Sequence, residues 1–226
     1  LTPGPTPLLP EGLAAQSLAT LHHRTPQFRA LFKQARAALG RFYRLDAGEP
    51  VVMFAGSGSL GMEAALVNAV QAGDTVLVAH AGKFGERWLK IAKSYGLSVI
   101  EVQSEYGEAI QPEQLERALA GAPRIAAFCV QEHESSTGVR HPVKELSAVL
   151  RKHQPEALVI ADGITGVGVH DIKLSDGIDA LACSSQKALA LQPGLAFVAL
   201  SSRYIQALDR PRLPRFYLDI RQELKA

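Results

Sequence analysis

The 226-residue sequence is poor in cysteine, methionine and tryptophan, with two, two and one of each. So few cysteines exclude a disulfide framework. Cys129 and Cys183 each lie in an apolar run, which favours buried, reduced thiols and a cytoplasmic protein. There is no apolar run long enough to span a membrane and no charged-then-apolar leader. We therefore expect a cytoplasmic protein without a membrane partner.

The sequence also has no excess charge of either sign, with 24 Lys and Arg against 22 Asp and Glu. The basic residues are scattered among the acids, so no nucleic-acid partner is expected. Repeats and low-complexity segments are missing too. His133 and Glu134 have side chains that bind metals, but no further His, Asp or Glu cluster has the spacing of a metal site. We expect no metal.

From residue 50 onward, apolar runs of strand length alternate with segments of helical periodicity. Several strands are apolar on both faces, as in a largely parallel sheet covered by helices on both sides. The connection over residues 191–194 is short, which allows one antiparallel strand. We predict an α/β fold with a mostly parallel seven-stranded sheet sandwiched by helices. The predicted strands cover 51–54, 75–79, 97–102, 125–130, 157–161, 180–183 and 195–200, and the helices 27–43, 62–70, 85–95, 112–119 and 143–152.

The first 25 residues differ from the rest, because Thr2–Pro7 holds three prolines and a glycine and reads as a stiff, extended loop. We predict an N-terminal arm over residues 1–25 and one large domain over 26–226.

Lys187 is the only charged residue between Asp179 and Arg203. Desolvation of its ammonium group is costly, and it lowers the pKa so that the neutral amine becomes a nucleophile. One interpretation is a lysine that forms a Schiff base with a cofactor aldehyde. The alternative is a lysine that extends to the surface from a strand end.

A turn rich in glycine and serine follows the first strand, at Ala55–Glu63. Its backbone and hydroxyl groups, ahead of a helix, suit a phosphate. The spacing of Gly56, Gly58 and Gly61 also matches the dinucleotide fingerprint, although no acid ends the next strand to hold a ribose. A purely structural turn is the third interpretation.

Three more loops follow predicted strands, where ligands bind in open α/β sheets. Phe84 could stack on a planar ring or pack as a hydrophobic staple. Ser135 and Thr137 lie in a polar loop and could donate to a ligand. Asp162 ends an apolar strand, so it needs either a cationic partner or a capping role in its own loop. A lysine for an aldehyde, an aspartate for a ring nitrogen, a phosphate turn and an aromatic ring together are the set that pyridoxal phosphate requires.

The chain resembles the class V aminotransferases of fold type I, especially the alanine–glyoxylate and serine–pyruvate enzymes. The resemblance runs nearly end to end. Its motifs are Thr2–Pro5, Gly56–Ser59 with Glu63–Leu66, Gly82–Gly85, Glu134–Val139, Asp162–Ile164, Ser185–Leu189 and Phe216–Ile220.

The resemblance implies that Lys187 carries pyridoxal 5'-phosphate as a Schiff base and that Asp162 pairs with its pyridine nitrogen. The remaining implied contacts divide among phosphate, ring and substrate. They are Ser57, Gly58, Ser59 and Gln186 for the phosphate, Phe84 and Ile164 for the two ring faces, Ser135 for the ring and the substrate, and Gly4 for the substrate entrance. At Ser59-Leu60 the alanine–glyoxylate enzyme has a glycine-histidine-cysteine run, so this part of the turn departs from the family.

The implied activity is transamination of alanine or serine with a keto acid such as glyoxylate or pyruvate, in a homodimer with shared active sites. The resemblance also implies a C-terminal small domain after Phe216–Ile220, which this sequence lacks, so we expect a truncated chain of uncertain activity. Three alternatives are a pyridoxal-phosphate lyase resembling cysteine desulfurase, a nucleotide-dependent oxidoreductase and an inactive dimerising fragment.

Overall fold

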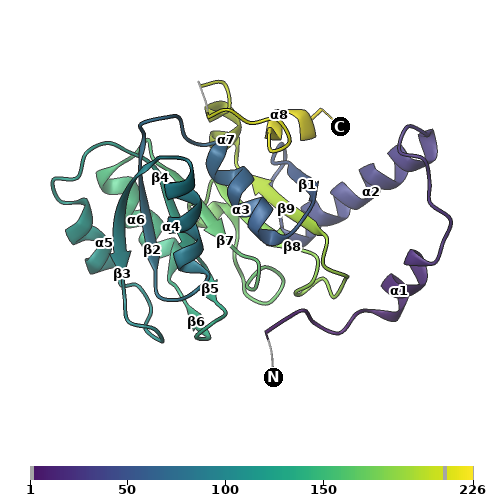
Figure 1. Cartoon of the computed structure of the whole chain (residues 1–226), viewed down its shortest axis with the longest axis horizontal. Helices are drawn as coiled ribbons and strands as arrows, with labels where there is room; N and C mark the ends of the chain where they lie inside the picture. Colours follow the sequence, from purple (N-terminus) through teal and green to yellow (C-terminus); the bar gives the residue numbers. More distant parts are fainter. Residues whose placement is uncertain (1–2, 211–212, 226) are drawn as a thin grey trace.

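The structure, a computed structural model, describes residues 3–210 and 213–225. Its centre is a seven-stranded sheet in the order β1-β9-β8-β7-β4-β2-β3 (Figure 1). Strand β9 pairs antiparallel with both β1 and β8, and the remaining pairs are parallel. The carboxyl ends of the other six strands therefore lie along one edge. The strands are β1 (Val51–Ala55), β2 (Thr75–His80), β3 (Ser98–Gln103), β4 (Ile125–Gln131), β7 (Leu158–Asp162), β8 (Ala180–Ser184) and β9 (Leu195–Leu200).

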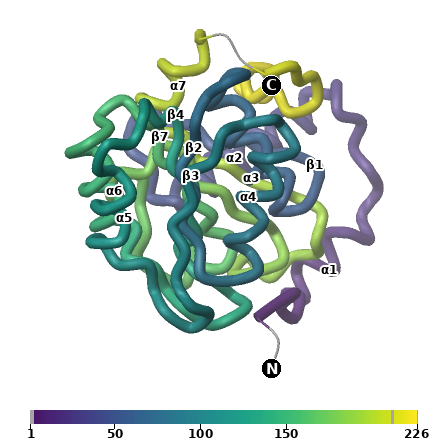
Figure 2. The backbone as a smooth tube through the Cα atoms, turned by 60° about the vertical axis from the view of Figure 1, so that its left-hand side comes forward, coloured from purple at the N-terminus to yellow at the C-terminus, as the bar shows by residue number. Residues whose placement is uncertain are grey.

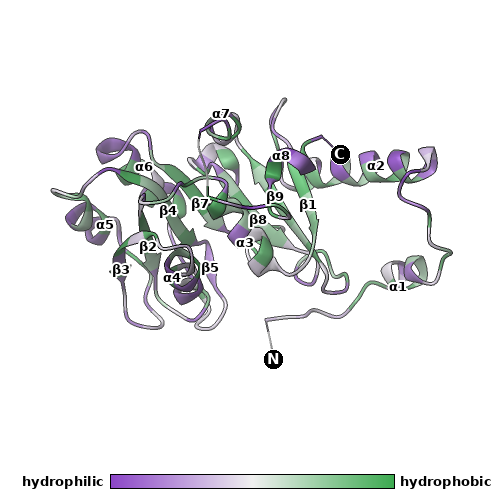
Figure 3. Ribbon diagram, turned by 45° about the horizontal axis from the view of Figure 1, so that its top comes forward, coloured by the Kyte–Doolittle hydropathy of each residue, from purple (hydrophilic) through white to green (hydrophobic). Residues whose placement is uncertain are grey.

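Helices cover both faces of this sheet, and a separate apolar cluster fills each side. One face is covered by α3 (Gly58–Val67), α4 (Gly85–Ser94), α7 (Ser202–Ala207) and α8 (Ile220–Glu223). The other is covered by α2 (Pro26–Phe42), α5 (Pro112–Leu119) and α6 (Val143–His153). The strands are green with apolar residues in Figure 3, while the covering helices alternate green and purple, as expected for half-buried helices. The predicted sandwich is confirmed.

The seven predicted strands are all present, with ends that differ by one residue at most. Both cysteines are free and buried, one in each apolar cluster. The prediction for α3 was wrong at both ends, since the helix begins at Gly58 and ends at Val67. Its buried small residues pack on β8 and β9, so tertiary contacts rather than periodicity decide its start. The patterns did not predict α1 (Pro10–Gln16), α7, α8, the 3₁₀ turn η1 (Leu174–Asp176) or the ribbon of β5 (His133–Glu134) and β6 (Val139–Arg140).

The N-terminal arm runs beneath the carboxyl edge of the sheet and then up the side of β1 to α2 (Figures 1 and 2). Its backbone bonds to the loop after β8: the Thr6 N–H donates to the Gln186 carbonyl at 3.0 Å, and the Leu9 N–H donates to the Ala190 carbonyl at 2.9 Å. The arm was predicted to be extended, but α1 interrupts it. Leu1 and Thr2 of the predicted arm lie outside the described residues.

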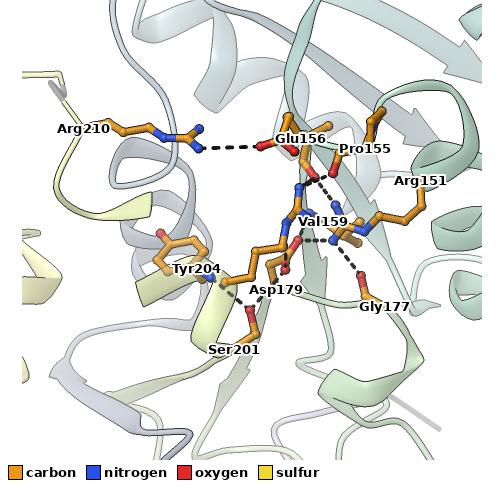
Figure 4. A network of polar contacts seen from close by, with 11 residues as sticks. Arg151, Pro155, Glu156, Val159, Gly177, Asp179, Ser201, Tyr204 and Arg210 are labelled. Atoms are coloured by element: carbon orange, nitrogen blue, oxygen red, sulfur yellow. Dashed lines mark hydrogen bonds and ion pairs between the residues drawn. The ribbon is translucent and has the colours of Figure 1, made fainter. Parts of the chain in front are cut away.

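A buried carboxylate ties together the opposite end of β8 (Figure 4). Asp179 is 3% exposed and forms an ion pair with Arg151. It also accepts from the Val159 N–H at 2.8 Å and from the Ser201 hydroxyl at 3.1 Å. These contacts join α6, β7, β8 and the end of β9, so they help to fix the position of β8 in the sheet.

Among the helices of the described ranges, none combines the length and the apolar composition that a membrane span requires.

Candidate active site

A cavity of about 270 Å³ opens at the carboxyl edge of the sheet. The loops after β1, β2, β4, β7 and β8 meet there with the N-terminal arm. The ten site residues that the resemblance implies all line this cavity, whereas Thr137, the other candidate donor of its loop, does not: the ten are Gly4, Ser57, Gly58, Ser59, Phe84, Ser135, Asp162, Ile164, Gln186 and Lys187.

Lys187 lies in the turn after β8 and projects against the N-terminal arm. Its Nζ donates to the Pro3 carbonyl at 3.2 Å. The Thr6 hydroxyl donates to the Lys187 carbonyl at 2.9 Å, so the arm holds both ends of this residue. A Cβ on Gly4 would lie 2.9 Å from Lys187 Nζ, and Gly4 has φ +152°, so this position requires glycine. Partial burial lowers the pKa of Lys187, which increases the fraction of the side chain that is present as the neutral amine.

Asp162 is the last residue of β7 and is 5% exposed. Its Oδ1 accepts from the Ile164 N–H at 2.8 Å, so it caps its own loop as well as facing the cavity. Burial raises the pKa of Asp162 to about 7, against the opposing effects of that hydrogen bond and of the charges on Arg87 and Lys187. A cationic nitrogen bound beside it would restore the charged form.

The amino end of α3 forms the second side of the cavity. Ser57 is the N-cap residue but its hydroxyl does not cap the helix, so it is free for a ligand. Gly58 and Ser59, the first two residues of the helix, have N–H groups without an acceptor inside it, and both residues line the cavity. A Cβ on Gly58 would lie 2.5 Å from Ile164 Cδ1, so glycine is needed for this close approach.

Phe84 is held at the cavity by a buried carboxylate that the patterns did not identify as structural. Glu134 is fully buried and accepts from the Phe84 N–H at 3.3 Å and the Gly85 N–H at 2.8 Å. It also accepts from the Ser136 hydroxyl at 2.6 Å. Glu134 thus caps α4 and is not available as a metal ligand. Ser135 hydrogen-bonds to Thr165 across the cavity.

Five further residues line the cavity and were not predicted for this site: Arg87, His133 and Thr165, together with Pro5 and Pro193. Arg87 lies three residues after Phe84 on a helix, and this spacing was the signal that could have identified it. His133 Nδ1 lies 3.2 Å from His170 Nε2, with Glu132 nearby. Arg140 Nε donates to Glu132 Oε1 at 2.6 Å, whereas the buried Oε2 has no hydrogen-bond partner among the described residues. Glu132, His133 and His170 thus form a group whose ligand atoms lie within 4.8 Å of one another, which the spacing in the sequence did not indicate.

The sheet topology contradicts the dinucleotide interpretation of Gly56, Gly58 and Gly61. That motif requires a strand, a helix and a neighbouring parallel strand. Here β1 pairs with the antiparallel β9, and four strands separate it from β2.

Comparison with known proteins decides the family. The model of aminotransferase class V matches residues 11–214. The chain belongs to this family. It is 36% identical to an uncharacterized aminotransferase of Helicobacter pylori, over 99% of the chain and 59% of the relative.

Solved structures of class V aminotransferases agree with the fold. An aspartate aminotransferase of Thermus thermophilus superposes with a TM-score of 0.90 at 38% identity, covering 100% of this chain and 62% of that one. An alanine–glyoxylate aminotransferase of Nostoc sp. gives a TM-score of 0.91 at 33% identity, covering 100% and 59%. The chain thus spans about three fifths of the length of these family members.

Proposed function

We propose that the protein uses pyridoxal 5'-phosphate to transfer the amino group of a small amino acid, alanine or serine, to a keto acid such as glyoxylate or pyruvate. The observation that carries the proposal is that Lys187 and Asp162, 25 residues apart in the sequence, line one cavity with the amino end of α3. Residues 26–226 would form the cofactor-binding large domain, with residues 1–25 as the arm.

The lining residues fit this cofactor. Gln186 Oε1 is buried and has no hydrogen-bond partner among the described residues, so nothing holds the amide in this orientation, and its NH₂ could turn to donate to a phosphate. Gly58 leaves Ile164 close to the turn, on the side of the cavity where one ring face would rest. Phe84 would cover the other face, and Ser57 and Ser59 would donate to the phosphate. Pyridoxal phosphate supplies an aldehyde that condenses with amines and a ring that accepts an electron pair.

Two residues would carry out the proton chemistry. Lys187 Nζ, whose pKa is lowered by partial burial, would accept the proton from the α-carbon of the substrate and return it to the cofactor. Asp162 would hold the ring nitrogen in its protonated form, which favours electron withdrawal from the α-carbon. Ser135, linked to Thr165, would orient the ring, and Gly4 would leave room for a small substrate over Lys187.

The glyoxylate assignment rests on the activity for which the Nostoc relative is named, and the two solved relatives are named for different amino donors. We also propose a homodimer with shared active sites. Exposed apolar side chains along the arm, at Leu9, Leu13, Leu18 and Leu21, support burial against a second copy. Light scattering of the purified protein checks this; a monomer at micromolar concentration would contradict it.

The decisive experiment is a visible absorption spectrum with pyridoxal phosphate, followed by borohydride reduction and peptide mapping. We expect a yellow protein whose band bleaches, with the label on Lys187. Lys187→Ala should give no such band and should lose transaminase turnover. Lys83→Ala is the control, because Lys83 is an exposed lysine that does not line the cavity. A label elsewhere, or wild-type turnover by Lys187→Ala, would rule the proposal out.

A further inference from the structure

Arg87 is a cation that the predicted site did not include. It lies in the first turn of α4 and lines the cavity with Lys187. Its guanidinium carbon lies 4.9 Å from the centroid of the Phe84 ring. Its Nη1 donates to the Ser59 hydroxyl at 2.7 Å. Arg87 therefore contacts both the Phe84 ring, at the start of α4, and Ser59, at the amino end of α3.

Arg87 has no carboxylate within ion-pair distance over residues 3–210 and 213–225. This contrasts with other partly buried arginines of the same chain. Arg151 pairs with Asp179, and Arg215 lies near Asp219. Asp162 is the one carboxylate lining the cavity, and it already accepts from its own loop. A half-buried guanidinium that lines a cavity without an anion is suited to an anion from outside the chain.

The groups around Arg87 define the chemistry of that anion. Ser59 accepts a hydrogen bond from Arg87, so its own proton is free to donate. Ser57, whose hydroxyl makes no capping bond to the helix, and Gly58 at the start of α3 line the same cavity as Arg87. This set contains hydroxyl, amide and guanidinium donors and the positive end of a ten-residue helix. Such a set suits a tetrahedral dianion with several acceptor oxygens better than a planar carboxylate.

We propose that Arg87 is the cationic ligand of the cofactor phosphate, acting together with Ser59 and the amino end of α3. This inference rests on the proposed function. Arg87 would supply through its guanidinium a charge that a serine cannot provide, and would hold the serine hydroxyl in a donating orientation.

The test separates the phosphate from the rest of the cofactor. Cofactor-free wild type, Arg87→Met and Arg87→Lys are each titrated with pyridoxal phosphate and with pyridoxal, which lacks the phosphate, and binding is followed by absorbance. We expect Arg87→Met to weaken pyridoxal phosphate about 10- to 100-fold, as for loss of a charged hydrogen bond. Pyridoxal affinity should change less than about twofold, since that ligand makes no phosphate contact. The affinity of Arg87→Lys for pyridoxal phosphate should lie between those of the wild type and Arg87→Met, because lysine keeps the charge but lacks the planar set of N–H donors of a guanidinium.

Inorganic phosphate provides an independent readout. It should compete with pyridoxal phosphate in the wild type and much less in Arg87→Met. Arg117→Met, on the exposed face of α5, is the control and should behave as wild type. Melting curves of all variants check that they fold.

Three other results would contradict the inference. Equal losses for both ligands would mean that Arg87 acts through Phe84 or through folding. Unchanged affinity for both would remove the role altogether. A raised KM for the amino acid with unchanged cofactor affinity would assign Arg87 to the substrate carboxylate. A wild type that forms no coloured complex with either ligand would instead contradict the proposed function itself.

Discussion

Asp162 is the residue at which function and stability oppose each other most clearly. A carboxylate that is 5% exposed loses its hydration, and a single N–H bond and two distant cations do not replace it. The pKa consequently rises from 3.8 to about 7 in the folded protein. A group with a raised folded-state pKa is costly to ionise, and the bound cofactor would offset that cost.

The sign of the pH effect follows from where the proton is held. Between pH 3.8 and about 7, the unfolded chain has released the Asp162 proton while the folded chain still binds it. Raising the pH through this range therefore lowers the free energy of unfolding, and the loss is complete above the folded-state pKa. A shift of this size corresponds to an upper value of about 4 kcal/mol.

We predict that Asp162→Asn stabilises the cofactor-free protein at pH 8 by about 2–4 kcal/mol and that the gain disappears as the pH falls toward 4. Turnover should fall about 100-fold, because the ring nitrogen loses its charged partner. Urea unfolding at several pH values measures the first effect, and steady-state kinetics measure the second. Asp209→Asn, at an exposed aspartate, is the control. A destabilised variant at pH 8 would refute the assigned cost.

The sequence predicts individual site residues where their surroundings are unusual. Lys187 and Asp162 stand out because each is a charge beside an apolar run, and apolar runs are easily identified as strands. Arg87 does not stand out, because charged residues near a helix start are common, and Glu134 does not stand out, because it lies in a polar segment whose pattern does not reveal what it faces. The contact of Pro3 with Lys187 joins residues 184 positions apart, which no local pattern encodes.

At the scale of elements, the position of α4 depends on Glu134 from the neighbouring loop. Its carboxylate accepts two N–H groups at the amino end of the helix, where the helix dipole also favours a negative charge. Glu134→Gln keeps one acceptor but places an amide N–H₂ against these donors. We predict a loss of about 1–3 kcal/mol in stability and weaker cofactor binding, because Phe84 is released.

Urea denaturation and cofactor titration measure these two effects. Glu113→Gln is the matched control, since Glu113 is an exposed acid in the first turn of α5. Comparable losses in both variants would show that Glu134 has no special role in holding α4.

Helices and strands could be predicted where burial makes their residues apolar throughout. The strands of the sheet are apolar on both faces, so their ends were predicted within a residue. The helices α1, α7 and α8 are short, at seven, six and four residues, and too few positions repeat to give a helical pattern. The start of α3 was missed because its glycines and small residues are selected by contact with β8, β9 and Ile164 rather than by helix propensity.

At the scale of the whole molecule, the sheet works as a support that brings five loops to one edge. The sequence predicts which loops meet there, because parallel strands end on the same side. It does not predict the strand order, or that the arm closes the cavity, since both depend on contacts between distant segments. The order places β8 between β7 and β9, and thereby places Lys187 opposite Asp162.

Asp179 holds the end of β8 that lies far from the cavity. Replacing it therefore tests how strongly the stability of the whole fold depends on the contacts of this strand. Its carboxylate joins Arg151, the Val159 N–H and the Ser201 hydroxyl (Figure 4). Asp179→Ala would leave the Arg151 guanidinium without its carboxylate and Val159 without an acceptor. We predict a loss of about 3–5 kcal/mol, because breaking a buried pair leaves an uncompensated charge.

Glu156 offers a control within the same network. It is exposed and lies 3.9 Å from Arg210, a distance at which a surface pair contributes about 1 kcal/mol at most. Glu156→Ala should therefore unfold at nearly the wild-type urea concentration, while Asp179→Ala unfolds much earlier. Asp179→Asn should lie between them, because the amide oxygen still accepts from Val159. If the two alanine variants unfold at the same urea concentration, β8 is held by its apolar neighbours alone, and the carboxylate does not set the register that positions Lys187.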